Sequence, residues 1–480
     1  MRNKLSLLTL IIVIGLTANA QQKWNLRSIV DYAMANNINV KLTDVQAKVA
    51  ALVYNQTKLS QYPNLAFSGN TSLNSGSNQD PTTFSRITQT YLSASLQLQS
   101  SAQVFNFYSK RNSIASNQWE LQAAKANVDK AKNDIALTAA NAYLQILLAL
   151  QQQNIAAVQV QQTQAQLTNT QKLVAAGSLP ELNATQLEAQ LASDSVNYYT
   201  AQGNVTQAIL TLKTYMNIDA AAAFEVDTPP VASIPLEPIA DLQPAAVYNL
   251  AIANQPLQQY DTYKIKAAEK SAASARGAMY PSFSLFGNLG SSYIAANTPN
   301  YVSSLGVYSS SLSKVNVGGQ DYFIQVPSVI YTKKGTLKSD PFGTQLNDNF
   351  RQSVGISMSV PIFNGGSAKT NYQRSKLNIT SLQLQKNQDD QTLKQNIYAA
   401  YNAAVVAMQK FNASEKAVLA NQQTYDYAYK RFNVGMLGTF DLITTQNNLL
   451  RAKLEYTANQ FDYVFKMKVL EFYKGQGLKL

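Results

Sequence analysis

Cysteine and histidine are both absent from this chain of 480 residues. Their absence excludes a disulfide framework, a thiolate nucleophile, a histidine proton shuttle and an ordinary zinc site. Acidic residues are also few, 27 in all, and the sequence has neither a phosphate-binding glycine loop nor a G-x-S-x-G nucleophile elbow. We therefore expect a protein that is not an enzyme and that holds no cofactor and no metal.

Charged residues are scarce as well and make up 14% of the chain. The formal net charge is +12, and a basic balance is a feature that nucleic-acid-binding proteins share. Here, however, the lysines and arginines are scattered and form no dense basic block. The charge pattern therefore predicts a mildly basic surface and no nucleic acid partner.

Long apolar runs are missing after the first twenty residues. Those residues, MRNKLSLLTLIIVIGLTANA, have the basic start, apolar centre and small-x-small end of a signal peptide, so we expect residues 1–20 to be removed on export. The best later candidate, residues 136–150, is too short for a membrane helix and contains Asn141 and Gln145. An exported chain that crosses a membrane without helical spans must do so as a closed barrel of strands.

The sequence contains two related copies. QYPNLAFSGN at 61–70 resembles MYPSFSLFGN at 279–288, at an offset of 218 residues that also relates AMANN at 33–37 to AIANQ at 251–255. Further on, LVAAGSLPELNATQLEAQL at 173–191 resembles FNVGMLGTFDLITTQNNLL at 432–450, at an offset of 258 residues. The larger second offset indicates an insertion in the second copy.

These matches divide the expected mature chain into three segments. A first repeat covers residues 21–218, a linker rich in proline and alanine covers 219–244, and a second repeat covers 245–480. Each repeat is expected to contain a helix, two strands, a very long helix, a tight break and a last helix. The insertion lies near residues 294–345, and its serine, tyrosine, asparagine and glycine content is typical of an extracellular loop.

Strands are predicted by the alternation of apolar and small polar residues. The segments that alternate are NLAFSGNTSL at 64–73, LSASLQLQ at 92–99 and RQSVGISMSV at 351–360. An apolar outer face and a polar inner face are typical of outer-membrane barrels. Four strands cannot close a water-filled barrel, so several copies of the chain would have to combine their strands.

Helices of unusual length are predicted before the breaks. Residues 105–176 contain neither proline nor glycine, and at ~1.5 Å per residue they would form a rod of about 100 Å. Apolar or small residues recur every seven positions, which indicates coiled-coil packing. They are Leu121, Val128, Ile135, Ala142, Ala149 and Ala156 in this helix, and Leu442, Leu449, Tyr456, Tyr463 and Leu470 in the last one.

Taken in order, these features resemble the outer-membrane efflux protein family. The motifs that carry the resemblance are A-x-x-N at 33–36 and 251–254, YP at 62–63 and 280–281, [VI]FN at 104–106 and 362–364, and a helical break G-x-L at 177–179 and 435–437. Each motif is weak alone, and their shared order and duplication make the resemblance specific. It covers essentially the whole chain after the signal peptide.

The resemblance implies an α+β membrane protein that is a homotrimer. Three chains with four strands each would form one twelve-stranded outer-membrane β-barrel, continued by a long α-helical coiled-coil barrel in the periplasm of a Gram-negative bacterium. Such a channel is passive and docks with a periplasmic adaptor protein and an inner-membrane transporter. It is the exit duct of a tripartite efflux pump or a type I secretion system, and drugs, metals and proteins all leave cells through such ducts.

The resemblance also assigns roles to the two breaks, which would be the tips of two helical hairpins. Asp441 matches the first acid of a ring at the periplasmic gate, and Thr444 stands where a second acid is common. Phe432 and Leu437 replace a tyrosine and an arginine of the closing network, so we expect a hydrophobic closure. Asn183 is the counterpart of Asp441 in the first repeat. The expected adaptor contacts are Gly177, Ser178 and Leu179 in one tip, and Val434, Gly435, Met436, Leu437 and Gly438 in the other.

Asp441 has a second interpretation that its position alone suggests. It follows a glycine turn, and Asp is a favoured helix N-cap, so its role would then be limited to the helix end. A ring of three Asp441 carboxylates would instead attract cations. Gly177 and Gly435 more simply provide the positive φ that the end of a helix needs.

Two Tyr-Pro pairs mark the passage from helix to strand. Proline disfavours helix in the residue before it, which places junctions at Tyr62-Pro63 and Tyr280-Pro281. Their tyrosines suit the interface with outer-membrane lipid, and simple packing explains them equally well. The rival class is a non-channel structural or adhesive coiled-coil surface protein, which would use the same helices without a pore.

Overall fold

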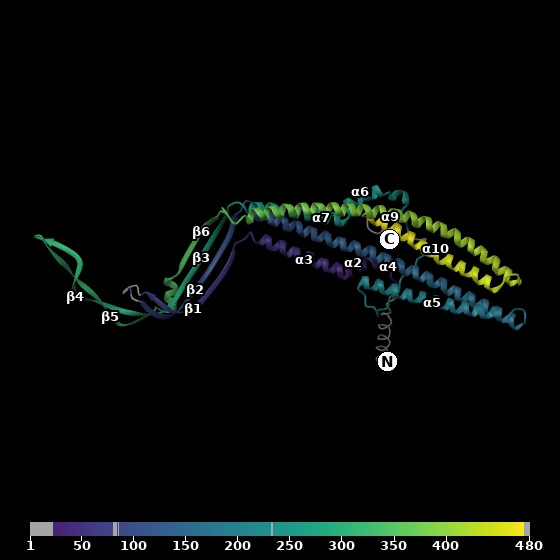
Figure 1. Ribbon diagram of the computed structural model, residues 1–480, viewed down its shortest axis with the longest axis horizontal. Coiled ribbons are helices and arrows are strands. Elements are labelled where there is room, and N and C mark those ends of the chain that lie inside the picture. Colours follow the sequence, from purple (N-terminus) through teal and green to yellow (C-terminus); the bar gives the residue numbers. More distant parts are fainter. Residues whose placement is uncertain (1–22, 80–83, 85, 232–233, 475–480) are drawn as a thin grey trace, which may run out of the picture. The chain divides into compact units, whose positions relative to one another are not determined.

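A computed structural model describes residues 23–79, 84, 86–231 and 234–474 (Figure 1). The predicted signal peptide, residues 1–20, lies outside the described residues. The order helix, helix, strand, strand, long helix, helix occurs twice along the chain. Its first occurrence consists of α2 (Leu26–Asn36), α3 (Ile38–Leu59), β1 (Asn64–Gln79), β2 (Arg86–Phe105), α4 (Ser109–Ala175) and α5 (Glu181–Met216).

The second occurrence is interrupted between its two strands. It consists of α6 (Pro244–Asn254), α7 (Pro256–Gly277), β3 (Ser282–Ala295), β6 (Arg351–Ser359), α9 (Ser367–Asn433) and α10 (Thr439–Tyr473). The interruption contains β4 (Asn297–Val317), β5 (Gln320–Lys338) and the short helix α8 (Phe342–Asp348). A 3₁₀ turn, η2 (Ile239–Leu242), precedes α6.

The segment expected to be a loop, residues 294–345, instead contains regular structure. β4 and β5 pair with each other as a separate antiparallel ribbon. Gly318 and Gly319 both have positive φ at the turn, which a two-residue hairpin of this type requires. Tyrosine and β-branched residues between serines give the segment its strand propensity. Serine and glycine content alone therefore predicted too little structure here.

The four repeat strands form one antiparallel sheet in the order β1-β2-β3-β6. β1 pairs with β2 from Asn64–Ser101 to Gln79–Arg86, and β3 joins the two repeats by pairing with β2 on one side and β6 on the other. In the described residues, β1 and β6 each have a partner strand on one side only. The sheet therefore ends at two open edges.

Contacts divide the chain into two compact units, and each unit takes segments from both repeats. One unit has the bounds Met1–Tyr54, Ala115–Ser271 and Arg374–Leu480, and its described residues are mainly helical. The other contains the sheet and consists of Asn55–Ile114 and Ala272–Gln373. The units differ from the repeats because the chain passes from helices to strands and back within each repeat.

The two largest hydrophobic clusters of the helical unit each join four elements. The first packs α2, α4, α5 and α10 through residues such as Ile146 and Leu212. The second packs η2, α6, α9 and α10 through residues such as Ile397 and Met467. Leu236, from the proline-rich segment 219–244, contacts both clusters. That segment is therefore packed into the core, although its composition suggested a plain linker.

The long helices place their seven-residue seams inward. Val128, Ala142, Ala149 and Ala156 of α4 are buried, as are Leu442, Leu449 and Leu470 of α10. None of the helices in the described part of the chain combines the length and the apolar composition needed to cross a lipid bilayer. The buried seam residues Ala142, Leu442 and Leu470 pack against neighbouring helices of the same unit.

A carboxyl group on α7 is buried in an unfavourable setting. Asp261 is 6% exposed, and among the described residues its Oδ2 atom and both side-chain amide atoms of nearby Gln258 lack a hydrogen-bond partner. Burial raises the pKa of Asp261 from 3.8 to about 6. The charge of Asp389 adds to this rise, that of Lys386 opposes it, and that of Asp390 adds to it.

Asp261→Asn should stabilise the protein at neutral pH, because it removes a charge that folding must bury. The pKa of Asp261 is higher in the folded state than in the unfolded one, so stability falls as pH rises from about 4 to about 6 and stays low above that range. We expect the variant to melt at a higher temperature than the wild type at pH 8, with a gain of up to about 2 kcal/mol. The difference should vanish near pH 4.

Melting temperatures of the detergent-solubilised protein between pH 4 and pH 8 measure this effect. Glu269→Gln, at an exposed position of the same helix, is the matched control and should show no such pH dependence. Equal melting temperatures of Asp261→Asn and the wild type at pH 8 would refute the expectation.

Candidate functional site: hairpin tips and sheet faces

Both long helices end in the same backbone turn. Gly177 follows α4 with φ +73° and Gly435 follows α9 with φ +77°. Each turn has the pair of amide-to-carbonyl bonds that defines a Schellman motif. The bonds are Gly177 to Val174 at 2.9 Å and Ser178 to Leu173 at 2.9 Å, and Gly435 to Phe432 at 2.9 Å and Met436 to Arg431 at 2.8 Å. The two tips therefore have the same backbone turn, and they lie 258 residues apart in the sequence.

The second tip displays more apolar surface than the first. Val434, Met436 and Phe440 are each about 70% exposed, whereas Ser178 occupies the place of Met436 in the first tip. Large apolar side chains at the outermost point of a helical hairpin are costly to leave in water. They are therefore the residues of this tip that are best placed to contact another molecule.

Asp441 is not the N-cap of α10, so that interpretation was wrong. Gly438 is the N-cap and makes no side-chain cap bond, while Asp441 stands at the third helical position and is exposed. An acid in the first turn interacts favourably with the helix dipole. Asn183 holds the same third position in α5 and is half-buried, and the Thr444 hydroxyl donates to the Phe440 carbonyl at 2.8 Å.

Phe432 and Leu437 lie together inside the second hairpin. Phe432 is 9% exposed and packs with Ala428 of its own helix and Leu442 of α10, and the half-buried Leu437 covers the same cluster. The Phe432 side chain is therefore engaged within one chain. This cluster fixes the turn that carries Gly435 and Asp441.

A buried polar network joins the two hairpins a few turns from their tips. The Asp194 carboxylate of α5, 1% exposed, accepts hydrogen bonds from the Thr163 hydroxyl at 2.6 Å, from the Gln190 amide at 2.8 Å and from the Gln159 amide at 3.5 Å. The Gln446 amide of α10 donates to the Thr163 hydroxyl at 3.0 Å. Within the part of the chain that the structure describes, neutral donors thus hold a buried carboxylate between α4, α5 and α10.

Two further contacts extend this network. Gln190 and Asn447 exchange a pair of amide hydrogen bonds, each 3.2 Å long, between α5 and α10. The Gln166 amide donates to the Tyr425 hydroxyl at 2.8 Å and so connects α4 with α9. Sequence reasoning missed these residues because Gln and Asn side chains are also typical of a solvated helix face. The seven-residue interval between Gln159 and Gln166 is the signal that could have located them.

The two Tyr-Pro pairs lie in the short gaps between α3 and β1 and between α7 and β3. The two tyrosines differ in their surroundings. Tyr62 is 68% exposed, whereas Tyr280 stacks on Phe107 with ring centroids 4.9 Å apart. Tyr280 is thus partly packed, with 42% of its surface exposed, and Tyr62 is the more exposed of the two.

The sheet has one apolar face and one polar face. Register places the apolar residues of all four strands on the same side, and these are Leu65, Phe67 and Leu73, then Leu92, Leu96 and Leu98, then Phe283, Leu285 and Leu289, and finally Val354, Ile356 and Met358. Many of these side chains are open to solvent in the single chain, with Val354 at 80% exposed. Serine, asparagine and glutamine dominate the opposite face.

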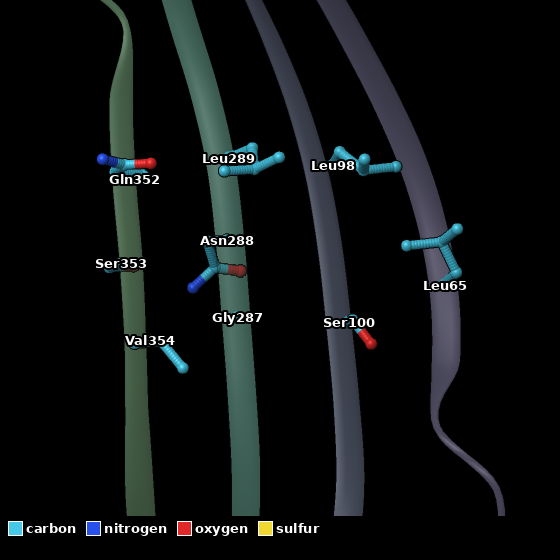
Figure 2. A pocket seen from close by; sticks show the side chains of 9 residues that line it. All are labelled: Leu65, Leu98, Ser100, Gly287, Asn288, Leu289, Gln352, Ser353 and Val354. Atoms are coloured by element: carbon cyan, nitrogen blue, oxygen red, sulfur yellow. The ribbon is translucent and has the colours of Figure 1, made fainter.

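A shallow hollow of about 500 Å³ interrupts the apolar face (Figure 2). Leu65, Ser100, Gly287 and Val354 form one row across the four strands, and the two small residues in its middle leave the space. Leu289 borders the hollow in the neighbouring row. A depression with apolar walls on an exposed apolar face suits a hydrocarbon chain better than a polar ligand.

Comparison with known proteins agrees with this geometry. A profile of the family described as outer membrane efflux protein matches residues 29–217 and 247–466. Outer membrane efflux protein BepC of Brucella suis is 20% identical over 374 residues, which cover 76% of this chain and 69% of BepC. Outer membrane protein TolC of Escherichia coli K12 is 26% identical over 124 residues, a quarter of each chain (25% and 25%).

Among solved structures, CusC is similar over 95% of this chain and 93% of its own, with a TM-score of 0.75 and 16% identity. The crystallographic description of CusC refers to transmembrane channel formation. At this identity the similarity shows the fold. The resemblance that the sequence motifs indicated is confirmed.

Gly435→Ala should destabilise the second tip, because Gly435 has φ +77° and an L-residue pays about 1 kcal/mol or more in that region. Space is not the obstacle, since a Cβ there would meet no atom within 4 Å. Gly203→Ala is the matched control. A Cβ at Gly203, inside α5, also meets nothing within 4 Å, and alanine there should stabilise the helix by about 0.5–1 kcal/mol. Melting temperatures that shift in the same direction for both variants would contradict the role of the turn.

Proposed function

The chain belongs to the outer membrane efflux protein family, and we propose that three copies of it form one passive exit channel. Family membership places it in the outer membrane of a Gram-negative bacterium, with a part that extends into the periplasm. The observation that carries the proposal is the sheet. One face is apolar on all four strands, the other face is polar, and both edges are open.

In a lipid bilayer, the two open edges of the sheet would have to pair with strands of other chains. Each backbone N–H or C=O left unpaired in the hydrocarbon region costs several kcal/mol. β1 of one chain would pair with β6 of the next, and three repetitions would close a barrel of twelve strands. The apolar face would then contact lipid, and the serine- and asparagine-rich face would line water.

The helices would continue this barrel as a tunnel. α4 and α9 contain 67 residues each, a length of about 100 Å at the usual rise. Many Gln, Asn and Ser side chains on α9 are exposed in the single chain, as suits helices that line water without much charge. Twelve helical segments from three chains would form the wall of this periplasmic barrel, packed as coiled coils along the buried seams.

The hairpin tips would form the periplasmic gate. A three-fold arrangement would bring three Asp441 carboxylates into one ring, with Thr444 one helical turn further on and Asn183 at the matching place of the other hairpin. Phe432 and Leu437 would support a hydrophobic closure by holding each tip rigid.

The same tips would dock with a periplasmic adaptor protein, which couples the channel to an inner-membrane transporter. The exposed residues Val434, Met436 and Phe440 support such a contact on the second tip, and the Gly177–Leu179 turn presents the smaller surface of the first. The transporter would supply the energy for a tripartite efflux pump or a type I secretion system.

Asp441→Asn should lower cation selectivity and weaken block by divalent cations, because the substitution removes three carboxylates from the narrowest part of the pore. We expect a change of about twofold or more in the ratio of potassium to chloride permeability in planar bilayers. Asp426→Asn, an exposed acid on α9, is the control and should leave the ratio unchanged.

The wild type in this experiment also tests the channel itself. A trimeric protein with single-channel conductance is expected. A chain that is monomeric and gives no conductance would favour a structural or adhesive coiled-coil protein. If the wild type conducts and Asp441→Asn leaves the permeability ratio unchanged, Asp441 is not part of the gate. The proposed channel would be retained in that case.

A further inference from the structure

The sheet carries only two charged side chains in its four described strands, and both are arginines. Arg86 begins β2 and Arg351 begins β6. β1 and β3 contain no charged residue at all. In a surface otherwise made of neutral residues, a single fixed charge sets the sign of the local potential.

The two arginines lie on opposite faces. Side chains alternate along a strand, so Arg351 lies on the same face of β6 as Ser353 and Gly355. Ser353 pairs with Asn288 of β3 and Gly355 with Phe286. This face is the polar face of the sheet. Arg86 shares its side of β2 with Leu92, Leu96 and Leu98, so it belongs to the apolar face.

Around Arg351 the polar face is built from neutral hydrogen-bonding groups. Its row across the sheet continues through Gly290, Gln97 and Ser68, and the glycine beside it leaves room for the long side chain. A cavity of about 580 Å³ here is lined by Arg351, Gln97, Asn288 and Ser353 among others, and no carboxylate is among its described lining residues. The site thus offers one cation and several neutral polar groups.

Arg351 is exposed and, within the described part of the chain, forms no ion pair. The acids Asp340 and Asp348 precede it in the chain, and Lys333, Lys334 and Lys338 more than balance them. Acids are therefore not in excess among the described residues that directly precede Arg351 in the chain. Its five donors in a planar fork suit carboxylate, sulfate and phosphate groups.

Arg351 stands at the end of β6 opposite to the end that leads into α9. β1 and β2 continue for eleven residues beyond the row of Arg351, from Ser68 to Gln79 and from Gln97 to Arg86. In the proposed trimer this row lies within the barrel wall, and its polar face lines the lumen. We infer that three Arg351 side chains form a basic ring in the lumen of the barrel and that this ring binds multivalent anions and favours the exit of anionic molecules.

Dimensions of the proposed barrel make such a ring effective. Twelve tilted strands about 4.8 Å apart give a backbone diameter of roughly 24 Å. Arginine side chains that extend inward would bring all three guanidinium groups within about 10 Å of the axis, which is about one Debye length at physiological salt. An anion in the lumen would therefore feel the whole ring.

The inference rests on the proposed channel, and bilayer recordings can test it separately. We expect inositol hexakisphosphate to block the wild-type channel and to bind at least about tenfold more weakly to Arg351→Gln. Arg351→Lys should retain part of the block, because it keeps the charge and loses the fork. Arg351→Glu should raise the ratio of potassium to chloride permeability by about twofold or more.

Arg86→Gln is the matched control, since it removes the other arginine of the same sheet from the opposite face. It should leave both block and permeability ratio unchanged. Two results would overturn the ring and leave the proposed channel in place. One is a conducting wild type that the anion blocks no more strongly than Arg351→Gln. The other is an equal effect of the Arg86 and Arg351 substitutions. Absence of any conductance in the wild type would instead contradict the channel itself.

Discussion

A β-strand in lipid must be paired on both sides, and this chain provides a four-stranded sheet with two open edges. The other features of the sheet follow from that constraint. One face is apolar on every strand because it would meet lipid, and the other is polar because it would meet water. Four strands cannot satisfy their own edges, so in the proposed channel identical chains complete the wall. The open edges are thus the reason why the proposed channel needs several copies of the chain.

The two hairpin tips of the helical unit share one backbone turn and differ in their side chains. Both tips have the same Schellman turn on a glycine with positive φ. Only one of them combines exposed Val434 and Met436 with Asp441. Between the hairpins, the buried network around Asp194 and Thr163 fixes one relative arrangement, because displacement would leave buried donors without acceptors. Specific buried hydrogen bonds of this kind favour a single packing of helices over a sliding one.

Much of the fold could be predicted because local chemistry specifies it. Glycine at 177 and 435 marks the turns, proline at 63 and 281 marks the start of strands, and alternation identifies the two faces of the sheet. Duplication reinforced each of these signals, since a weak motif found twice at a constant offset is a strong one.

The remaining features depend on contacts between distant segments. The burial of Asp194 and Gln446 is decided by which helices meet, and their side chains resemble those of a solvated face. Phe432 was expected to take part in a hydrophobic closure, and its contacts with Ala428 and Leu442 depend on how the two helices of its hairpin meet. The ribbon β4–β5 was expected to be a loop, because its serine and glycine content is typical of loops. The strand propensity of its β-branched residues was given too little weight.

Disulfide cross-linking across the open edges tests the closed barrel most directly, because the chain contains no cysteine of its own. Phe67→Cys on β1 would be combined in turn with Val354→Cys, Ile356→Cys or Met358→Cys on β6, which share the apolar face. At the register that brings the two Cβ atoms close enough for a disulfide, oxidation should give covalent dimers and trimers on denaturing gels. Leu98→Cys with Leu289→Cys, which face each other within one sheet, should give monomers only. Monomers alone from every β1–β6 pair, with the control disulfide formed, would contradict a barrel closed by three chains.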